Sequence, residues 1–157
     1  SQISSPAASP AHKYEYVSPL LRTLKVKQAM ITSCPILSPE ASVGKAAEII
    51  KNCGMDATVV KKGELVGIIA NEDVLPIPRK QRSITKVESV MSTNLVVIHL
   101  EETLEQALEL MVARKIAVLP VVDKKSPTKL LGLVTRRSII QAYESEARKM
   151  VGEVPST

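Results

Sequence analysis

The stretch Leu130-Leu-Gly-Leu-Val-Thr-Arg-Arg-Ser138 is an apolar run that leads directly into polar and basic residues. Its length suits a buried strand, and Thr135 stands where the N-cap of a following helix is expected. Unpaired N–H groups at that helix start, together with Arg136 and Arg137, would attract a phosphate. The alternative is a capped helix whose two arginines are simply solvated, and this stretch alone leaves both open.

A second copy of this layout occurs earlier in the chain, in Leu65-Val-Gly-Ile-Ile-Ala-Asn-Glu-Asp73. It places Ala70 opposite Thr135, and Asp73 opposite Ser138. The similarity continues upstream, where residues 26–30 match residues 87–91 and residues 39–50 match residues 100–111. A long repeat that occurs twice predicts two supersecondary units, each with an apolar face that the other covers.

The spacing between the two copies changes along the chain. Met30 and Met91 are offset by 61 residues (91 − 30), whereas Gly67 and Gly132 are offset by 65 (132 − 67). We expect small insertions near Lys115 and within residues 124–128 to absorb the difference.

Composition indicates a folded protein of modest size. The 157 residues are 45% hydrophobic, which is enough for one compact unit built from two halves. The chain has no Phe or Trp, so it lacks the aromatic platforms that single-stranded nucleic-acid binders use. The net charge of +5 comes from scattered Lys and Arg, and nucleic acid is not an expected partner. We expect a cytoplasmic protein, since no signal peptide or membrane-length apolar segment is present.

Chemistry-bearing residues are sparse. Cys34 and Cys53 are not in a CxxC pair, so reduced thiols are the expectation. His12 and His99 are isolated in sequence and predict no metal site, no cofactor and no nucleophile–base pair. An enzyme is therefore the weakest hypothesis.

The order of elements is the same in both halves: strand, helix, strand, strand, helix. In the first half, Ile36–Leu37 is a brief strand, a helix opens at Ser38–Glu40 and ends at Gly54, and residues 58–60 and 65–69 form a hairpin. In the second half, the matching elements are residues 95–98, 101–113, 117–122 and 130–134, followed by a helix from Thr135 to about Met150. The predicted boundaries are a tail at 1–19, a first repeat at 20–78, a linker at 79–86, a second repeat at 87–147 and a tail at 148–157.

The ordered repeat resembles a tandem pair of cystathionine-β-synthase (CBS) domains. Met30, Met91, Leu119-Pro-Val-Val-Asp123 and Gly132-Leu-Val-Thr-Arg-Arg137 carry the resemblance, which covers roughly residues 20–146. It implies an α+β fold, an α/β sandwich of two β-α-β-β-α repeats packed about a pseudo-twofold axis. It also implies a homodimer and a regulatory role, with an adenine nucleotide or S-adenosylmethionine bound between the repeats.

In this family, a Thr or Ser of the last motif binds phosphate and an Asp three residues later holds the ribose. The chain splits that pattern, because the first copy has Asp73 after Ala70 and the second has Ser138 after Thr135. The resemblance implies a second cleft with Thr135, Arg136 and Arg137 on phosphate and Ser138 on ribose, and we expect the phosphorylated ligand there. Its opposite wall would come from the first repeat, namely Ile36, Leu37, Ser38, Met55, Asp56 and Ala57.

The first cleft would set Asp73 against the second repeat, namely Val97, Ile98, His99, Ala117 and Val118. It would offer a ribose acceptor without an evident phosphate anchor. For Asp73, Asp56 and His99 the alternatives are, respectively, a first-turn acid favoured by the helix dipole, a solvated helix exit and a surface histidine.

Two functions follow as hypotheses. The first is a ligand-sensing module that binds AMP, ADP or ATP and passes a conformational change to an attached domain. The second is a structural dimerisation or docking module without ligand, belonging to a larger protein such as an enzyme, a transporter or a chloride channel, in which case the chain would be a cytosolic portion.

Overall fold

The computed structural model describes residues 19–152 of the 157. The predicted N-terminal tail, apart from residue 19, and the last residues of the predicted C-terminal tail lie outside the described residues, as does His12. After a short helical segment at 19–23, the elements follow in this order: η1 (Val26–Gln28), α2 (Val43–Asn52), β1 (Ala57–Lys62), β2 (Glu64–Ala70), α3 (Asn71–Val74), η2 (Arg79–Gln81), η3 (Val87–Ser89), α4 (Leu104–Arg114), β3 (Val118–Val122), β4 (Leu130–Thr135) and α5 (Arg136–Met150).

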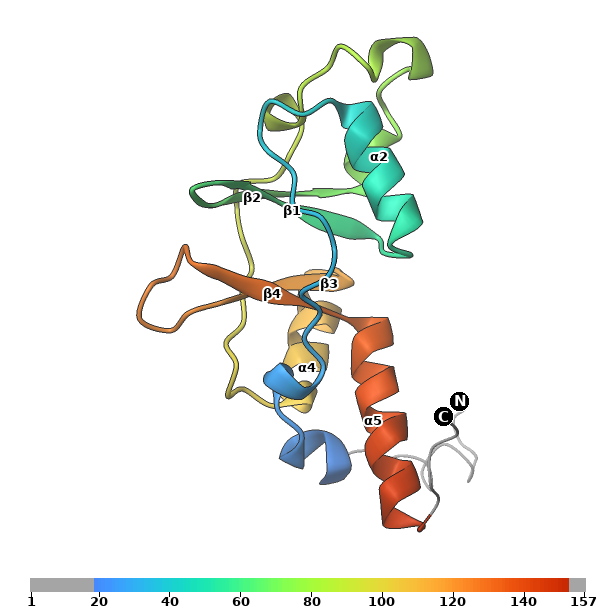
Figure 1. Ribbon diagram of the computed structural model, residues 1–157, viewed down its shortest axis with the longest axis vertical. Coiled ribbons are helices and arrows are strands. Elements are labelled where there is room, and N and C mark those ends of the chain that lie inside the picture. The colour runs from blue at the N-terminus through green and yellow to red at the C-terminus, as the bar shows by residue number, and fades with distance from the viewer. Residues whose placement is uncertain (1–18, 153–157) are drawn as a thin grey trace, which may run out of the picture.

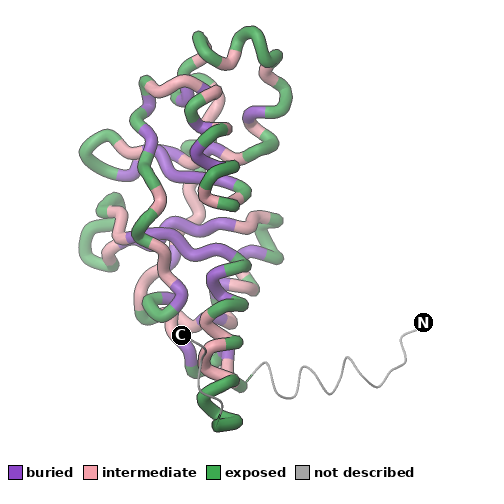
Figure 2. Tube along the Cα trace, turned by 45° about the vertical axis from the view of Figure 1, so that its right-hand side comes forward, coloured by how far each residue is buried: buried purple, intermediate pink, exposed green. Residues whose placement is uncertain are grey.

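The architecture is a stack of two small antiparallel sheets with helices on the outer faces. β1 pairs with β2 and β3 pairs with β4, and α2 covers the first sheet while α4 and α5 cover the second (Figure 1). Val59, Leu65, Val118 and Leu133 are buried between the sheets. Buried residues follow the strands and the inner faces of the helices (Figure 2). The predicted α+β fold with two packed repeats is therefore confirmed.

The predicted first strand of each repeat is shorter than expected. Leu37 makes only a single parallel bridge to Val60, and Ile98 makes the equivalent bridge to Val121. Both residues are buried, so each position is fixed by packing as well as by the bridge. The short apolar runs thus mark sheet edges and not full strands.

Two helices begin three residues later than their sequence suggested. α2 begins after Ser42, whose side chain accepts a hydrogen bond from the Lys45 N–H, and α4 begins after Thr103, which accepts from Gln106. A hydroxyl that satisfies a free N–H is a strong start signal and overrides the earlier Pro and Glu residues. α5 begins after Thr135 as predicted and continues to Met150, so it includes the first residues of the predicted C-terminal tail.

The extra four residues of the second repeat all lie in its hairpin. The offset is still 61 at the two parallel bridges and becomes 65 by the pairs Ala57–Ala70 and Val118–Thr135. The expected insertion near Lys115 is therefore wrong, and the polar loop between β3 and β4 takes up the whole difference.

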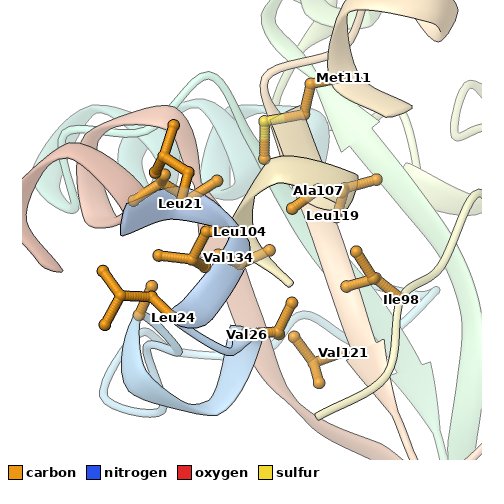
Figure 3. Packing of buried hydrophobic residues seen from close by; sticks show 12 residues of the cluster. Leu21, Leu24, Val26, Ile98, Leu104, Ala107, Met111, Leu119, Val121 and Val134 are labelled. Atoms are coloured by element: carbon orange, nitrogen blue, oxygen red, sulfur yellow. The ribbon is translucent and has the colours of Figure 1, made fainter. Parts of the chain in front are cut away.

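The segment that precedes the first strand of each repeat pairs with the sheet of the other repeat. Ile31 exchanges backbone hydrogen bonds with Leu133 of β4, at 2.7 and 2.9 Å, and Ser92 exchanges them with Ile68 of β2, at 2.8 and 3.0 Å. Leu21, Leu24 and Val26 consequently pack against the helices and strands of the second repeat (Figure 3). The chain therefore interlocks the two halves.

Glycines in β2 and β4 make these crossings possible. A Cβ added to Gly132 would lie 2.6 Å from Met30 Cγ and 2.7 Å from the Ile31 carbonyl oxygen. A Cβ added to Gly67 would lie 2.5 Å from Met91 Sδ. The matching methionines and glycines of the repeat are thus partners across the two halves.

We predict that Gly132→Ala lowers the free energy of unfolding by about 1–3 kcal/mol, because the backbone carbonyl of Ile31 must move. Gly44→Ala is the matched control, since its Cβ would meet Arg82 at an ordinary 3.6 Å and replace a glycine inside α2. That control should be neutral or stabilising by about 0.5 kcal/mol. Urea unfolding of both variants makes the measurement, and an unchanged midpoint for Gly132→Ala would contradict the interlock.

Candidate functional site

Two neighbouring cavities lie where the two sheets meet. One has a volume of about 400 Å³ and is called the Asp73 cleft, and the other has about 540 Å³ and is called the Thr135 cleft. Both volumes are in the range of roughly 300–1,000 Å³ that small-molecule sites occupy. The two clefts share four lining residues: Asp56, Ala117, Val118 and Arg136.

Equivalent backbone bonds hold the rims of the two clefts. The Asn71 N–H, at the start of α3, donates to the Asp56 carbonyl at 2.9 Å, and the Arg136 N–H, at the start of α5, donates to the Ala117 carbonyl at 3.3 Å. Each bond ties the start of a final helix to the beginning of the paired strand. Both helix starts therefore border a cavity, as the repeat predicted.

Asp73 lines its cleft with one carboxylate oxygen engaged. Oδ2 accepts a hydrogen bond from the Ala70 N–H at 2.8 Å, which fixes the side chain. Oδ1 has no hydrogen-bond donor among the residues that the structure describes. A half-buried carboxylate with one oxygen available can accept bonds from ligand hydroxyls.

Two cationic side chains border the same cleft, for which the sequence had indicated no evident phosphate anchor. Lys115 and Arg136 both line it and both are exposed, so neither charge is desolvated in the fold. Lys115 adopts the left-handed conformation, with φ of 56°, at the place where the first repeat has Gly54. This conformation ends α4 at Lys115, where the backbone N–H bonds back to the carbonyls of Met111 and Val112.

Polar and apolar residues complete the Asp73 cleft, and sequence reasoning missed several of them. Ser92, Asn94 and Val96 line it from the segment after Met91, and Ile116 lines it beside Lys115. The expected contacts Ile98 and His99 are not there, because Ile98 is in the core and His99 faces a different cavity, paired with Glu102 at 2.9 Å. Val97 belongs to the inter-sheet core, and the expected Ala117 and Val118 do line the cleft.

No local pattern in the sequence marks the missed residues. The bridge between Ser92 and Ile68 places the segment after Met91 on β2, so residues 92, 94 and 96 reach the cleft in place of the expected 97–99. Only the crossing of the two halves reveals this, because within its own repeat that segment leads toward Ile98.

The Thr135 cleft gathers part of the predicted set. Met55 and Asp56 face Thr135, Arg136 and Arg137 across it, as expected. Ile36, Leu37 and Ser38 do not line it, since Leu37 is buried in the first core and the other two are exposed. Ala57 lines the Asp73 cleft instead. The loop after α2 thus forms the wall that the strand was expected to form.

Thr135 and Ser138 satisfy each other. Ser138 Oγ accepts from the Thr135 N–H at 2.9 Å and donates to the Thr135 carbonyl at 3.0 Å, while Thr135 Oγ1 accepts from the Ser138 N–H at 3.0 Å. Both residues are buried. The expected ribose contact by Ser138 does not fit this arrangement, because the hydroxyl proton is donated within the cap.

Cys34 and Cys53 are joined in a disulfide, which corrects the expectation of reduced thiols. The fold brings their Cα atoms to 6.4 Å, a separation that a disulfide spans, although nothing in their sequence spacing of 19 indicates a pair.

The described residues contain no cluster of His, Cys, Asp and Glu suited to hold a metal ion. Between residues 19 and 152, no helix has both the length and the apolar character needed to cross a membrane.

The sequence profile of the CBS domain matches residues 26–78 and 87–145, so the chain belongs to the CBS domain family. Inosine-5'-monophosphate dehydrogenase of Methanocaldococcus jannaschii is 31% identical over 144 residues, which are 89% of this chain. The match covers only 28% of that enzyme's length.

Solved structures share the fold. CBSX2 in complex with AMP is 26% identical, with a TM-score of 0.68, and the match covers 80% of this chain and 99% of CBSX2. The CBS domain pair of protein MJ0100, solved with 5'-methylthioadenosine and S-adenosyl-L-methionine, is 22% identical, with a TM-score of 0.65 and coverage of 78% and 97%. The latter similarity shows the fold alone.

We predict that Ser138→Ala lowers the free energy of unfolding by about 1–3 kcal/mol, because the buried Thr135 N–H loses its acceptor. Ser138→Asp is the matched variant. It should retain most of the stability, since a carboxylate can accept from Thr135 as Asp73 accepts from Ala70. Thermal unfolding compares the two variants, and equal losses would show that the cap does not control this helix start.

Proposed function

We propose that the chain is a regulatory module that binds an adenine nucleotide in the Asp73 cleft and transmits the binding event to a partner domain. One observation carries the proposal: the Asp73 carboxylate, with an available oxygen, and two cations border one mainly apolar cavity of ligand size, which Asp56 and Glu72 also line. These groups match the three chemical parts of a nucleotide, namely the ribose hydroxyls, the phosphate and the base.

Each part of the cavity suits one part of the ligand. Asp73 would accept from two ribose hydroxyls. Lys115 and Arg136 would bind the phosphate with charge-assisted hydrogen bonds. The base would pack on Ile68, Val96 and Ile116, with polar Ser92 and Asn94 at its edge.

The Thr135 cleft is the less suitable of the two. Arg136 and Arg137 could attract a phosphate there, but the hydroxyl expected to hold ribose is engaged in the helix cap. We therefore place the nucleotide in the Asp73 cleft, which differs from the sequence-based expectation. Solved relatives with AMP and with S-adenosylmethionine support an adenosine ligand in general.

Transmission would follow from the position of the cleft between the repeats. Asp73 and Ile68 belong to the first repeat, whereas Lys115, Val118 and Arg136 belong to the second. A ligand that contacts both sides favours the arrangement in which they are close, and it shifts the population by its differential affinity. An attached domain that contacts either repeat would respond to that shift. The module itself needs no catalytic residues for this role.

A docking function without ligand is the second candidate. Leu75, Val112 and Ile140 are large apolar side chains that are more than half exposed, and such surfaces often contact partners. Homodimerisation through the repeats, attachment to an enzyme, transporter or chloride channel, and a cytoplasmic location remain predictions.

We predict that AMP at a hundred times its dissociation constant adds about 2.7 kcal/mol of stability, which raises the melting temperature by several degrees. Asp73→Asn should weaken adenosine, AMP and S-adenosylmethionine alike by about tenfold or more, because all three carry the ribose. Titration calorimetry with each ligand makes the measurement. Absence of binding by all three would overturn the proposal in favour of docking.

We predict that Lys115→Gln and Arg136→Gln each weaken AMP about tenfold and leave adenosine nearly unchanged, because the lost charge acts on the phosphate. Lys80→Gln, in the exposed η2 segment, removes a charge away from both clefts and is the control. Equal losses for AMP and adenosine would show that these cations support the fold of the cleft and not the phosphate.

A further inference from the structure

The disulfide lies directly before one wall of the Thr135 cleft. Cys53 ends α2, and its N–H donates to the Ile49 carbonyl at 3.0 Å. Cys34 lies in the segment that leads to Leu37, which is bonded to β1 through Val59 and Lys61. The bond therefore fastens the end of α2 to a segment held on the sheet.

The wall begins at the next residue. Gly54, Met55 and Asp56 line the Thr135 cleft, and a Cβ added to Gly54 would lie 3.4 Å from Arg137 Nη1. The N–H groups of Gly54 and Met55 donate to the carbonyls of Lys51 and Ile50, at 3.1 and 3.0 Å. The order of this wall thus depends on the last turn of α2, which the disulfide restrains.

The Asp73 cleft has an equivalent wall, residues 115–117, but no disulfide precedes it. At the offset of 61, Leu95 and Arg114 occupy the places of Cys34 and Cys53. The Ile116 N–H donates to the Met111 carbonyl at 3.0 Å, just as the Met55 N–H donates to Ile50. The two walls share their backbone bonds and differ in the covalent link, so one serves as a reference for the other.

We propose that the Cys34–Cys53 pair is a reversible thiol switch that controls the order of the Gly54–Asp56 wall. A small dithiol reductant supplies two electrons and two protons, the S–S bond breaks, two thiols form, and the dithiol becomes a disulfide. Both cysteines are only half-buried, so a dithiol can reach them. Once the link is open, the last turn of α2 frays and the wall facing Arg137 loses its fixed position.

The experiment compares backbone hydrogen exchange in the oxidised protein and in protein treated with dithiothreitol. The Met55 amide should exchange at least about tenfold faster after reduction, while the Ile116 amide stays within about twofold. Reoxidation should restore the slow exchange at Met55. The double variant Cys34→Ser, Cys53→Ser should exchange quickly at Met55 with or without dithiothreitol.

Three results would overturn the switch. Unchanged exchange at Met55 would show that the wall is ordered without the link. Equal acceleration at Met55 and Ile116 would show that the disulfide stabilises the whole fold and not this wall. Full alkylation of both thiols in protein purified without reductant would show that the link does not form. All three readouts are independent of nucleotide binding in the other cleft.

Discussion

The packing of a methionine on a glycine, made twice across the two halves, is the contact on which the structure depends. Met30 lies over Gly132 and Met91 lies over Gly67, at distances that leave no room for a Cβ. The paired hydrogen bonds of Ile31 and Ser92 with the opposite sheets accompany these contacts. Because each repeat completes its core with the other's first segment, neither half has a full core alone.

This crossing also creates the clefts. The two sheets stack through Val59, Val118 and Leu133, and the starts of α3 and α5 meet the strand beginnings at their common edge. The linking segments then add side chains to the cavities, as Ser92 and Asn94 do in the Asp73 cleft. The clefts are thus a product of the pairing, and any ligand that contacted both sides of one would favour one arrangement of the halves.

The two repeats cap the start of their final helix with different side chains. In each, a side chain three residues into the helix accepts from the N–H of the residue before it: Asp73 from Ala70 and Ser138 from Thr135. Both satisfy the helix start, but only the carboxylate leaves an oxygen for a ligand. The disulfide beside the Thr135 cleft adds a second asymmetry. The Asp73 cleft therefore keeps a carboxylate oxygen without a donor among the described residues, whereas at the Thr135 cleft the hydroxyls are engaged in the helix cap and a disulfide lies beside the wall.

The sequence by itself determined the repeat, the hairpins, the α5 start at Thr135 and the residues Asp73, Met55, Asp56, Arg136 and Arg137 as cleft candidates. These follow from local patterns: alternation, capping and the doubled motif. Only the tertiary structure decided that Ile98 and Leu37 are core, that Lys115 joins Asp73, that Ser138 is engaged and that Cys34 meets Cys53. Each of those depends on segments far apart in the chain, and their separation in space is set by packing that no local pattern encodes.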